Sequence, residues 1–418
     1  MSSPNQNPRR RRRLARASAL LVAALALLAV LLPATSAAKT ARPLYWGAII
    51  GDEFTGTPPP WDMQAAVDFS RSVGKAPSLL QFSAPFSDCT RGPECTFLGF
   101  PAVAMQDIRS FGAIPFFNWG SQSIPATADN QAAFRLKRIA HGHLDPFIRN
   151  FAEDAAEWGH PFFLRFNWEM NGFWFPWSPG VNRNTSHTFI AAWRHIHDIF
   201  EEVGATNATW VWCPNVDFTR RLTPMKDVYP GNRYVDWTCL DGFNWGKTRN
   251  SIGWQSFNEV FRSTYRRLVK IAPHKPVMIG ETASEERGGS KAKWIRNMLN
   301  VIPKQYPKVR GLVYFDYEDQ GMHWPLSSSK AATSAFARGI RAAHYVGNAT
   351  AACQEGGSLR PPGRRRRPNR RPGPRRGCAE PPPQPKRASS ASSCAITSAG
   401  SFSPNFSRCS RSCGSCAL

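Results

Sequence analysis

Residues 161–172, PFFLRFNWEMNG, carry the pattern on which the fold assignment depends. The first six of these residues are almost continuously apolar, and the polar residues Asn167, Glu169 and Asn171 follow closely. A short apolar run without polar alternation is typical of a strand that is buried on both faces, as strands of parallel sheets are. The stretch therefore predicts a buried strand that delivers polar groups to one edge of a sheet.

Similar runs occur on both sides of this stretch. Together with residues 161–167 they make about eight strand candidates, at residues 44–50, 78–83, 113–118, 209–214, 238–244, 276–281 and 310–316. The segments between them have apolar residues at three- and four-residue steps, which is the period of an amphipathic helix. The clearest helical segments are residues 61–73, 146–158, 188–203, 255–271 and 291–301.

About eight strands that alternate with helices over roughly 300 residues favour a (β/α)8 TIM barrel in the α/β class. A doubly wound sheet is the alternative, but it needs a phosphate-binding glycine turn after the first strand. Residues 47–51, GAIIG, do not supply that turn. We therefore expect a barrel over residues 39–347, with a C-terminal extension that is disordered or forms a small disulfide-rich module.

The formal charge of +24 is concentrated at the two ends of the chain. Residues 1–38 hold six Arg and no acidic residue, and residues 353–418 hold 13 Lys or Arg against two Glu. The middle of the chain keeps +7, which is ordinary for a domain of its size. A nucleic-acid-binding protein gathers basic residues on its folded domain, so we expect no nucleic acid partner.

Residues 1–38 have the three parts of a secretory signal peptide. Arg residues at 9–13 and 16 precede an apolar run at 19–32, and small residues follow at 35–38. An uncleaved anchor is the alternative, but about 14 residues are short for a membrane span. We expect a secreted, extracellular protein whose mature chain begins near Lys39.

The C-terminal region and the cysteines form a separate question. Residues 348–388 are rich in Arg and Pro and predict a solvated linker, whereas residues 389–418 are a Ser/Cys-rich tail of unknown role. The basic tail is suited to contact with an anionic cell-wall polymer.

Ten Cys fit an oxidising compartment. Cys89 can pair with Cys95, and Cys213 with Cys239, while the six tail cysteines have no His beside them, so we expect no metal site.

Two glutamates close predicted strands, since Glu169 follows the fourth and Glu281 ends the seventh. The C-terminal ends of barrel strands meet at one face, where the active sites of such barrels lie. Glycosidic cleavage with retention needs two carboxyl groups about 5–5.5 Å apart, one as nucleophile and one as acid/base. The aromatic neighbours of Glu169 suit a carboxyl that stays protonated. Arg165 is suited either to hold an ionised Glu281 or to orient Glu169, and two structural salt-bridging acids are the alternative for the pair.

Residues 165–177, RFNWEMNGFWFPW, resemble the acid/base segment of glycoside hydrolase family 26, which contains the β-mannanases and related endo-glycanases. Residues 278–281, MIGE, resemble its nucleophile strand, and residues 142–145, GHLD, a segment that opens the preceding helix. The likeness extends over residues 44–345. It implies that Glu169 is the catalytic acid/base and Glu281 the nucleophile, and that no cofactor takes part.

The sequence departs from the family pattern at two positions. Trp168 stands where the family commonly has His, and Trp245 stands where it often has a Tyr that binds the nucleophile. The indole N–H of Trp245 can donate a hydrogen bond to Glu281 but cannot accept one. Both changes leave the two carboxyl groups in place and alter what touches the sugar.

Polar and aromatic residues near the strand ends complete the predicted site. The expected substrate contacts are Arg165, Asn171, Trp174, Trp177, Asn118, Trp119, His143, Asn244, Trp245 and Trp324. Asp241 and Asp316 are candidates for the same face, although acids there also cap helices or pair with Arg. Trp158, Trp193 and Trp294 lie in predicted helices and are expected in the core.

The sequence thus predicts a secreted, monomeric, retaining endo-β-glycanase that resembles mannan endo-1,4-β-mannosidase and acts on a polysaccharide without cofactor or metal. β-Mannan is the leading substrate, and mixed-linkage β-glucan and β-1,3-xylan are the alternatives. A non-catalytic carbohydrate-binding or cell-wall-associated protein on the same barrel is the alternative from another class.

Overall fold

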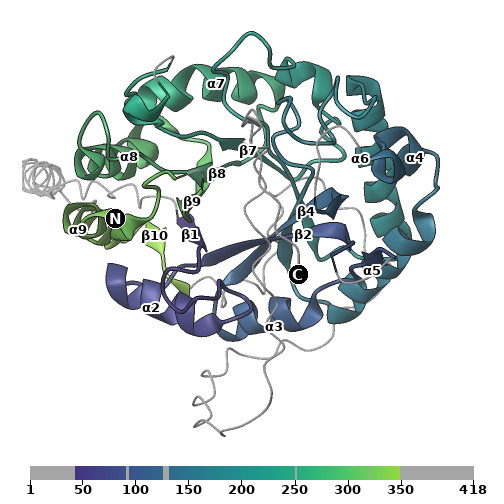
Figure 1. The fold of residues 1–418 in the computed structure, drawn as a ribbon, viewed down its shortest axis with the longest axis horizontal. Coiled ribbons are helices and arrows are strands. Elements are labelled where there is room, and N and C mark those ends of the chain that lie inside the picture. The colour runs from purple at the N-terminus through teal and green to yellow at the C-terminus, as the bar shows by residue number, and fades with distance from the viewer. Residues whose placement is uncertain (1–42, 91–93, 126–130, 250–251, 320, 349–418) are drawn as a thin grey trace, which may run out of the picture. The chain divides into compact units, whose positions relative to one another are not determined.

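The protein is described here from a computed structural model, which places residues 43–90, 94–125, 131–249, 252–319 and 321–348. Within these residues parallel strands form a closed barrel (Figure 1). The barrel strands are β1 (Leu44–Ile50), β2 (Leu79–Asp88), β4 (Ile114–Ile124), β5 (Phe162–Phe166), β6 (Ala208–Trp212), β7 (Trp237–Asp241), β8 (Val277–Thr282) and β9 (Val309–Asp316). Because β1 pairs with both β9 and β2, the ring closes, and the predicted (β/α)8 fold is confirmed.

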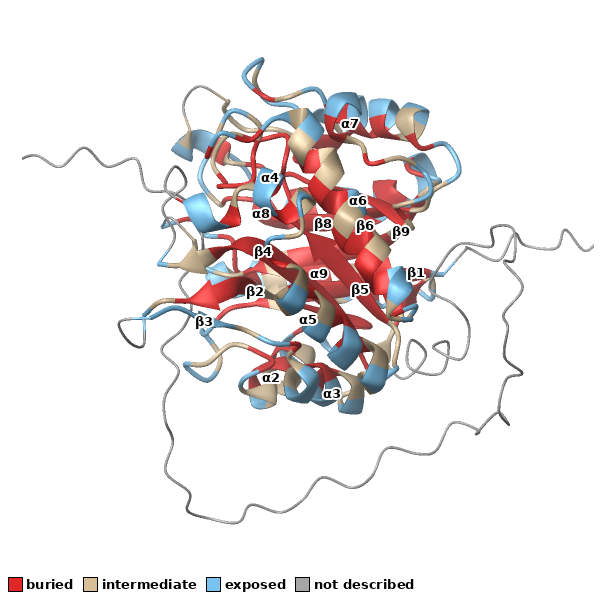
Figure 2. Ribbon diagram, turned by 90° about the vertical axis from the view of Figure 1, so that its right-hand side faces the viewer, coloured by how far each residue is buried: buried red, intermediate tan, exposed pale blue. Residues whose placement is uncertain are grey.

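Helices surround the barrel, with buried residues on their inward faces and exposed residues outside (Figure 2). They are α2 (Met63–Val73), α3 (Ala102–Ser110), α4 (Leu136–Ala140), α5 (Asp145–Trp158), α6 (Ser186–Glu202), α7 (Phe257–Ile271), α8 (Lys291–Gln305) and α9 (Lys330–Ile340). Local signals set their ends. Helix α7 begins with a reciprocal capping box between Ser256 and Glu259, and α5 ends at Gly159, whose φ of 72° suits glycine.

Two strands run further than the apolar pattern predicted. Strands β2 and β4 remain paired as far as Asp88 and Ile124, with a shift of register between Pro85 and Ser87. The short strand β3 (Thr96–Phe97) pairs antiparallel with the end of β2, and the predicted disulfide between Cys89 and Cys95 is confirmed beside it. Polar residues interrupt the apolar run in the second half of β2, which is why the sequence pattern ended too early.

Two of the three tryptophans that were expected in the core are buried in the helix layer, and the third, Trp158, is half-buried. Trp193 is buried and its indole N–H donates to the Tyr234 carbonyl at 2.9 Å. Trp294 is also buried and donates to the Gln255 carbonyl at 3.0 Å. The polar edge of each ring thus has a partner where water is excluded, so the packing role predicted for both is confirmed.

The predicted signal peptide and tail lie outside the described residues, as does the predicted linker except for Asn348 at its start. These assignments stay predictions. In the part of the chain that the structure describes, none of the helices has the length and apolar character that a bilayer crossing requires. A short strand, β10 (Tyr345–Val346), pairs with β1 and ends the described domain.

Candidate active site

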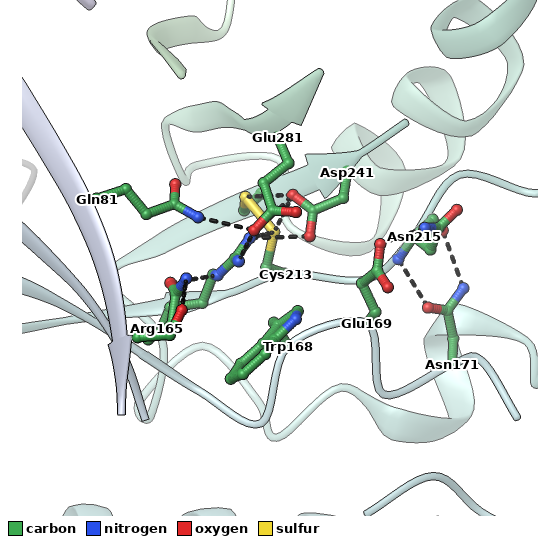
Figure 3. Close-up of polar contacts among 12 residues, drawn as sticks. Gln81, Arg165, Trp168, Glu169, Asn171, Cys213, Asn215, Asp241 and Glu281 are labelled. Carbon is green, nitrogen blue, oxygen red and sulfur yellow. Dashed lines mark hydrogen bonds and ion pairs between the residues drawn. A yellow bond between two sulfur atoms is a disulfide. The ribbon is translucent and has the colours of Figure 1, made fainter. Parts of the chain in front are cut away.

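The centre of the site is Arg165, which β5 carries into the barrel interior. Its side chain is fully buried, and its three nitrogens reach three other strands of the barrel (Figure 3). Nε donates to Asn118 Oδ1 on β4 at 2.7 Å, and Nη1 lies 3.0 and 2.8 Å from the two carboxylate oxygens of Asp241 on β7. Nη2 forms an ion pair with Glu281 on β8. Of the two roles that the sequence left open for Arg165, the structure supports holding Glu281.

Glu281 receives a second hydrogen bond from another strand of the barrel. Gln81 on β2 donates from Nε2 to Glu281 Oε1, the same oxygen that pairs with Arg165, at 2.7 Å. The guanidinium and the amide together place a negative oxygen at the end of β8 and leave Oε2 of Glu281 outside these two contacts. This is the arrangement that a carboxylate nucleophile needs.

Glu169 lies in a tight turn after β5 rather than within a strand. Asn167 and Glu169 have φ of 45° and 51°, the left-handed region, which costs non-glycine residues on the order of 1–3 kcal/mol. The turn is held by Glu169 N, which donates to the Cys213 carbonyl at 2.7 Å, and by Gly172 N, which donates to the Glu169 carbonyl at 2.8 Å. Asn167 Oδ1 accepts from Ser121 N at 2.8 Å. Neighbouring strands thus fix a strained turn that presents one carboxyl group.

The Glu169 carboxyl is buried and accepts two side-chain hydrogen bonds. Trp174 Nε1 donates to Oε2 at 2.8 Å, and Asn215 Nδ2 donates to Oε1. Burial raises the pKa of Glu169 to about 7, and the nearby charge of Glu281 adds to the rise, whereas the two hydrogen bonds and Arg165 oppose it. Glu169 can therefore hold a proton near neutral pH and still lose it, as a general acid and base must.

A disulfide lies directly beside the charged cluster. Cys213 and Cys239 are bonded, which confirms the predicted pair, and both are buried. Cys213 Sγ lies 3.6 Å from Arg165 Nη1 and 3.2 Å from Asp241 Oδ1. A Cβ at Gly280 would lie 2.3 Å from Cys239 Sγ, so only glycine fits there. The two sulfurs and Asp241 bring potential metal-ligating atoms within 4.8 Å of one another, but bonded sulfurs are not thiolate ligands.

The sequence model of glycosyl hydrolase family 26 matches residues 107–315, half of the chain, which includes the two glutamates and Arg165. The chain belongs to glycosyl hydrolase family 26. Endoglucanase H from Acetivibrio thermocellus is 42% identical over 207 residues, which are 49% of this chain and 23% of that protein. Beta-1,3-xylanase TXYA from a Vibrio species is 25% identical over 130 residues, 28% of this chain and 26% of that protein. The chain thus matches about a quarter of the length of each of these relatives.

Solved structures support the fold of this family 26 chain. The catalytic domain of an endo-beta-1,4-mannanase from Bacillus sp. JAMB-750 superposes with a TM-score of 0.56 at 18% identity, covering 75% of this chain and 90% of that one. An endo-beta-1,4-mannanase double mutant from Cellulomonas fimi gives 0.55 at 17% identity, covering 74% and 73%. At these identities the likeness concerns the barrel alone.

Three tryptophans predicted to contact substrate in this family 26 site are buried instead. Trp119 is fully buried, with its ring 4.1 Å from the Phe151 ring, between centroids, in the helix layer. Trp177 donates to the Trp168 carbonyl at 2.8 Å and is also fully buried, and Trp324 is 1% exposed. A ring without an exposed face cannot stack on a sugar, so these three predictions are wrong. Strand alternation is the reason for Trp119: its neighbour Asn118 points inward, and it points outward.

Two asparagines that were predicted to contact substrate hold other parts of the site in place instead. Asn171 exchanges hydrogen bonds with the backbone of Asn215, at 2.9 and 2.7 Å, and so positions the donor to Glu169. Asn244 is buried and binds Ser284 Oγ at 2.9 Å, within the loop wall. Asn171 thus reaches Glu169 only through Asn215, and Asn244 lies in the loop wall. Both side chains are fully buried, so their predicted direct contact with substrate is not supported.

Trp245 and His143 are both partly or fully exposed, so substrate can reach them. Trp245 is half-buried and carries the Arg249 guanidinium 3.5 Å above its ring. The donor that the structure places on Glu281 is Gln81, in the role that the sequence had offered to Trp245. His143 is exposed in the turn between α4 and α5. Trp168 is buried in the floor of the site, with the Arg165 guanidinium 5.4 Å from its ring centroid.

Sequence reasoning missed Gln81 and Asn215 and left Asp241 undecided. Asp241 ends β7 and Asn215 follows β6, so the rule that active-site residues collect at strand ends would have included both. Gln81 is the third residue of the long strand β2, and that rule does not select it. Asp316 has a different role, because its Oδ1 accepts from Leu326 N at 2.6 Å and its carboxyl group is hydrogen-bonded to the Glu53 side chain. It therefore anchors the loop after β9.

Proposed function

We propose that this chain is a retaining endo-β-glycanase that hydrolyses internal bonds of a β-glucan. The observation that carries the proposal is the different environment of the two glutamates. Burial raises the pKa of Glu169 to about 7, whereas Glu281 lies in an ion pair with Arg165. A carboxyl group that can hold its proton, beside a second carboxyl group paired with a guanidinium at the same barrel mouth, is what double displacement requires.

In the proposed reaction Glu281 attacks the anomeric carbon while Glu169 gives its proton to the departing glycosidic oxygen. The bond between the anomeric carbon and that oxygen breaks, and a glycosyl ester forms on Glu281. The ester is neutral, so the charge that helped to raise the pKa of Glu169 is lost. Glu169, now a carboxylate with a lower pKa, removes a proton from water, which attacks the ester and releases the sugar.

The choice of β-glucan rests on relatedness. Endoglucanase H is the relative at 42% identity, whereas the mannanase structures are 17–18% identical and support the fold only. β-Mannan, the substrate first expected from the sequence motif, becomes the second candidate. β-1,3-Xylan is third, because the relative with that name is 25% identical over a shorter stretch.

A substrate panel tests activity and specificity together. Purified protein should release reducing sugar from mixed-linkage β-glucan faster than from β-mannan or β-1,3-xylan. Glu169→Gln and Glu281→Gln should each lower the rate by a factor of about 10²–10⁴ or more, and the first product seen by NMR should keep the β configuration. Unchanged rates in either variant, or an α product, would contradict the mechanism. Binding without any cleavage by the wild type would favour the carbohydrate-binding alternative.

We further propose that the protein is secreted and monomeric, and that its basic tail touches the cell wall. The basic and apolar pattern of residues 1–38 supports export. Sequencing the N-terminus of protein recovered from culture medium should find a start near Lys39. A chain retained in cells with residues 1–38 intact would contradict export.

A further inference from the structure

The loop after β6 presents an exposed aromatic ring beside the acid/base. Phe218 is 40% exposed, and its ring centroid lies 6.0 Å from that of Trp174 at an interplanar angle of 32°. Trp174 in turn donates to Glu169 Oε2 at 2.8 Å. The exposed ring is therefore one side chain away from the carboxyl that delivers the proton.

The loop that carries Phe218 is anchored at both ends. On the first side, Val216 N donates to the Asp241 carbonyl at 2.8 Å and Asp217 N to Thr264 Oγ1 at 3.0 Å. On the far side, Thr223 N donates to the Asn171 carbonyl at 2.8 Å. These bonds hold the loop against the Glu169 turn and against β7. The fixed loop thus keeps the Phe218 ring at the surface beside Trp174, within reach of a bound substrate.

The rings beside Phe218 are also fixed. A Cβ at Gly172 would lie 2.6 Å from the six-membered ring of Trp174, so the motif glycine lets the indole lie flat on the backbone. Arg221, from the same loop as Phe218, places its guanidinium 4.0 Å from the Phe173 ring centroid. Trp174 thus lies between Phe218 and Phe173, whose ring centroid is 5.2 Å from that of Trp174. We call these three residues the aromatic strip below; its middle ring binds Glu169.

The chemistry of the reaction says which sugar meets this strip. The general acid must lie within hydrogen-bond reach of the glycosidic oxygen, so the sugar that leaves with that oxygen is the one next to Glu169. A β-linked pyranose with equatorial substituents has an apolar face of C–H groups that packs on an aromatic ring. We propose that Phe218 and Trp174 form the subsite for the leaving-group sugar, a β-linked pyranose of the polysaccharide. This inference rests on the proposed function.

The test separates leaving-group binding from the rest of catalysis by comparing two substrates. Mixed-linkage β-glucan must place a sugar on the strip, whereas the β-fluoride of a glucan trisaccharide releases fluoride, which occupies no sugar subsite. Phe218→Ala should lower kcat/KM for the glucan by about 5- to 30-fold and leave fluoride release within about twofold of wild type. The ratio of the two values is the quantity measured. Phe218→Tyr keeps the ring and should keep the ratio.

Phe97→Ala is the matched control, because Phe97 is also an exposed phenylalanine, 45% exposed, and packs on Phe134 and Phe147 rather than on Trp174. It should leave the ratio at the wild-type value. An unchanged ratio in Phe218→Ala, or an equal change in Phe97→Ala, would overturn the subsite. A wild type that hydrolyses neither polysaccharide nor fluoride would overturn the proposed function and the subsite together, which distinguishes the two failures.

Discussion

The hydrogen bond from Trp174 to Glu169 allows the pH dependence of the reaction to be tested by removing a single hydrogen-bond donor. Trp174→Phe keeps an aromatic ring and removes the Nε1–H that lies 2.8 Å from Glu169 Oε2. A hydrogen bond to a carboxylate stabilises the charged form, and the same contact lowers the pKa of Glu169 in the wild type. Its removal must therefore raise that pKa.

The size of the shift follows from the strength of one charge-assisted hydrogen bond. Such a bond contributes about 1.5 kcal/mol at the lower end of its range, and one pKa unit corresponds to about 1.36 kcal/mol. The pKa of Glu169, raised to about 7 in the wild type, should thus move up by about one unit in Trp174→Phe.

The assay is the pH profile of kcat/KM on mixed-linkage β-glucan, in which a sugar leaving group needs its proton. Glu169 acts as the acid, so the rate falls as pH rises through its pKa, and the variant should stay active to higher pH by about one unit. Trp177→Phe is the matched control, since the Trp177 N–H donates to the Trp168 carbonyl at 2.8 Å and not to a carboxylate. Its alkaline limb should not move. A Trp174→Phe limb that stays in place or shifts to lower pH would refute the assignment of Glu169 as the acid.

Three further predictions concern the support of the site. Replacing Cys213 and Cys239 by Ser opens a disulfide of sequence separation 26 and should lower the free energy of unfolding by about 3.5 kcal/mol, against about 2 kcal/mol for Cys89 and Cys95 with separation 6. Only the first replacement should also lower kcat, because Cys213 Sγ lies 3.6 Å from Arg165 Nη1. Equal effects of the two replacements on kcat would contradict this prediction. Asp241→Asn breaks a buried ion pair and should cost roughly 3 kcal/mol in urea unfolding, while a loss under 1 kcal/mol would show that Arg165 does not depend on it. Lys291→Met removes the ammonium group that binds the Trp324 and Pro325 carbonyls at 2.9 and 2.7 Å and Ser328 Oγ at 2.8 Å. The free energy of unfolding should fall by about 2–4 kcal/mol. An unchanged free energy of unfolding would show that the loop after β9 is stable without these hydrogen bonds.

The barrel and its two glutamates could be predicted because each depends on local sequence. A strand buried on both faces must be apolar along its whole length, and the residue after it must sit at the barrel mouth. Strand β1, for example, has the bounds that its apolar run predicted, Leu44–Ile50. The pairing of Cys213 with Cys239 was also within reach, since few other cysteines lie in the barrel.

The direction of single side chains was less predictable, because it depends on register. Asn118 and Trp119 are adjacent in sequence, yet Asn118 binds Arg165 inside the barrel and Trp119 packs on Phe151 outside it. A shift of one residue would exchange them. The aromatic residues near the strand ends were predicted to stack on sugar rings. Fully buried rings cannot do so, and only the half-buried and exposed rings are still suited to that role.

By itself, therefore, the sequence determined a barrel, the place of Glu169 and Glu281 on it, and the motif around Glu169. Only the tertiary structure shows the neighbours on which their proposed roles depend, because a carboxyl becomes an acid or a nucleophile through its neighbours. Gln81 and Arg165 lie 200 and 116 residues from Glu281 in the chain and converge on one of its oxygens. Closure of the barrel brings these partners together, and no local pattern along the chain records that contact.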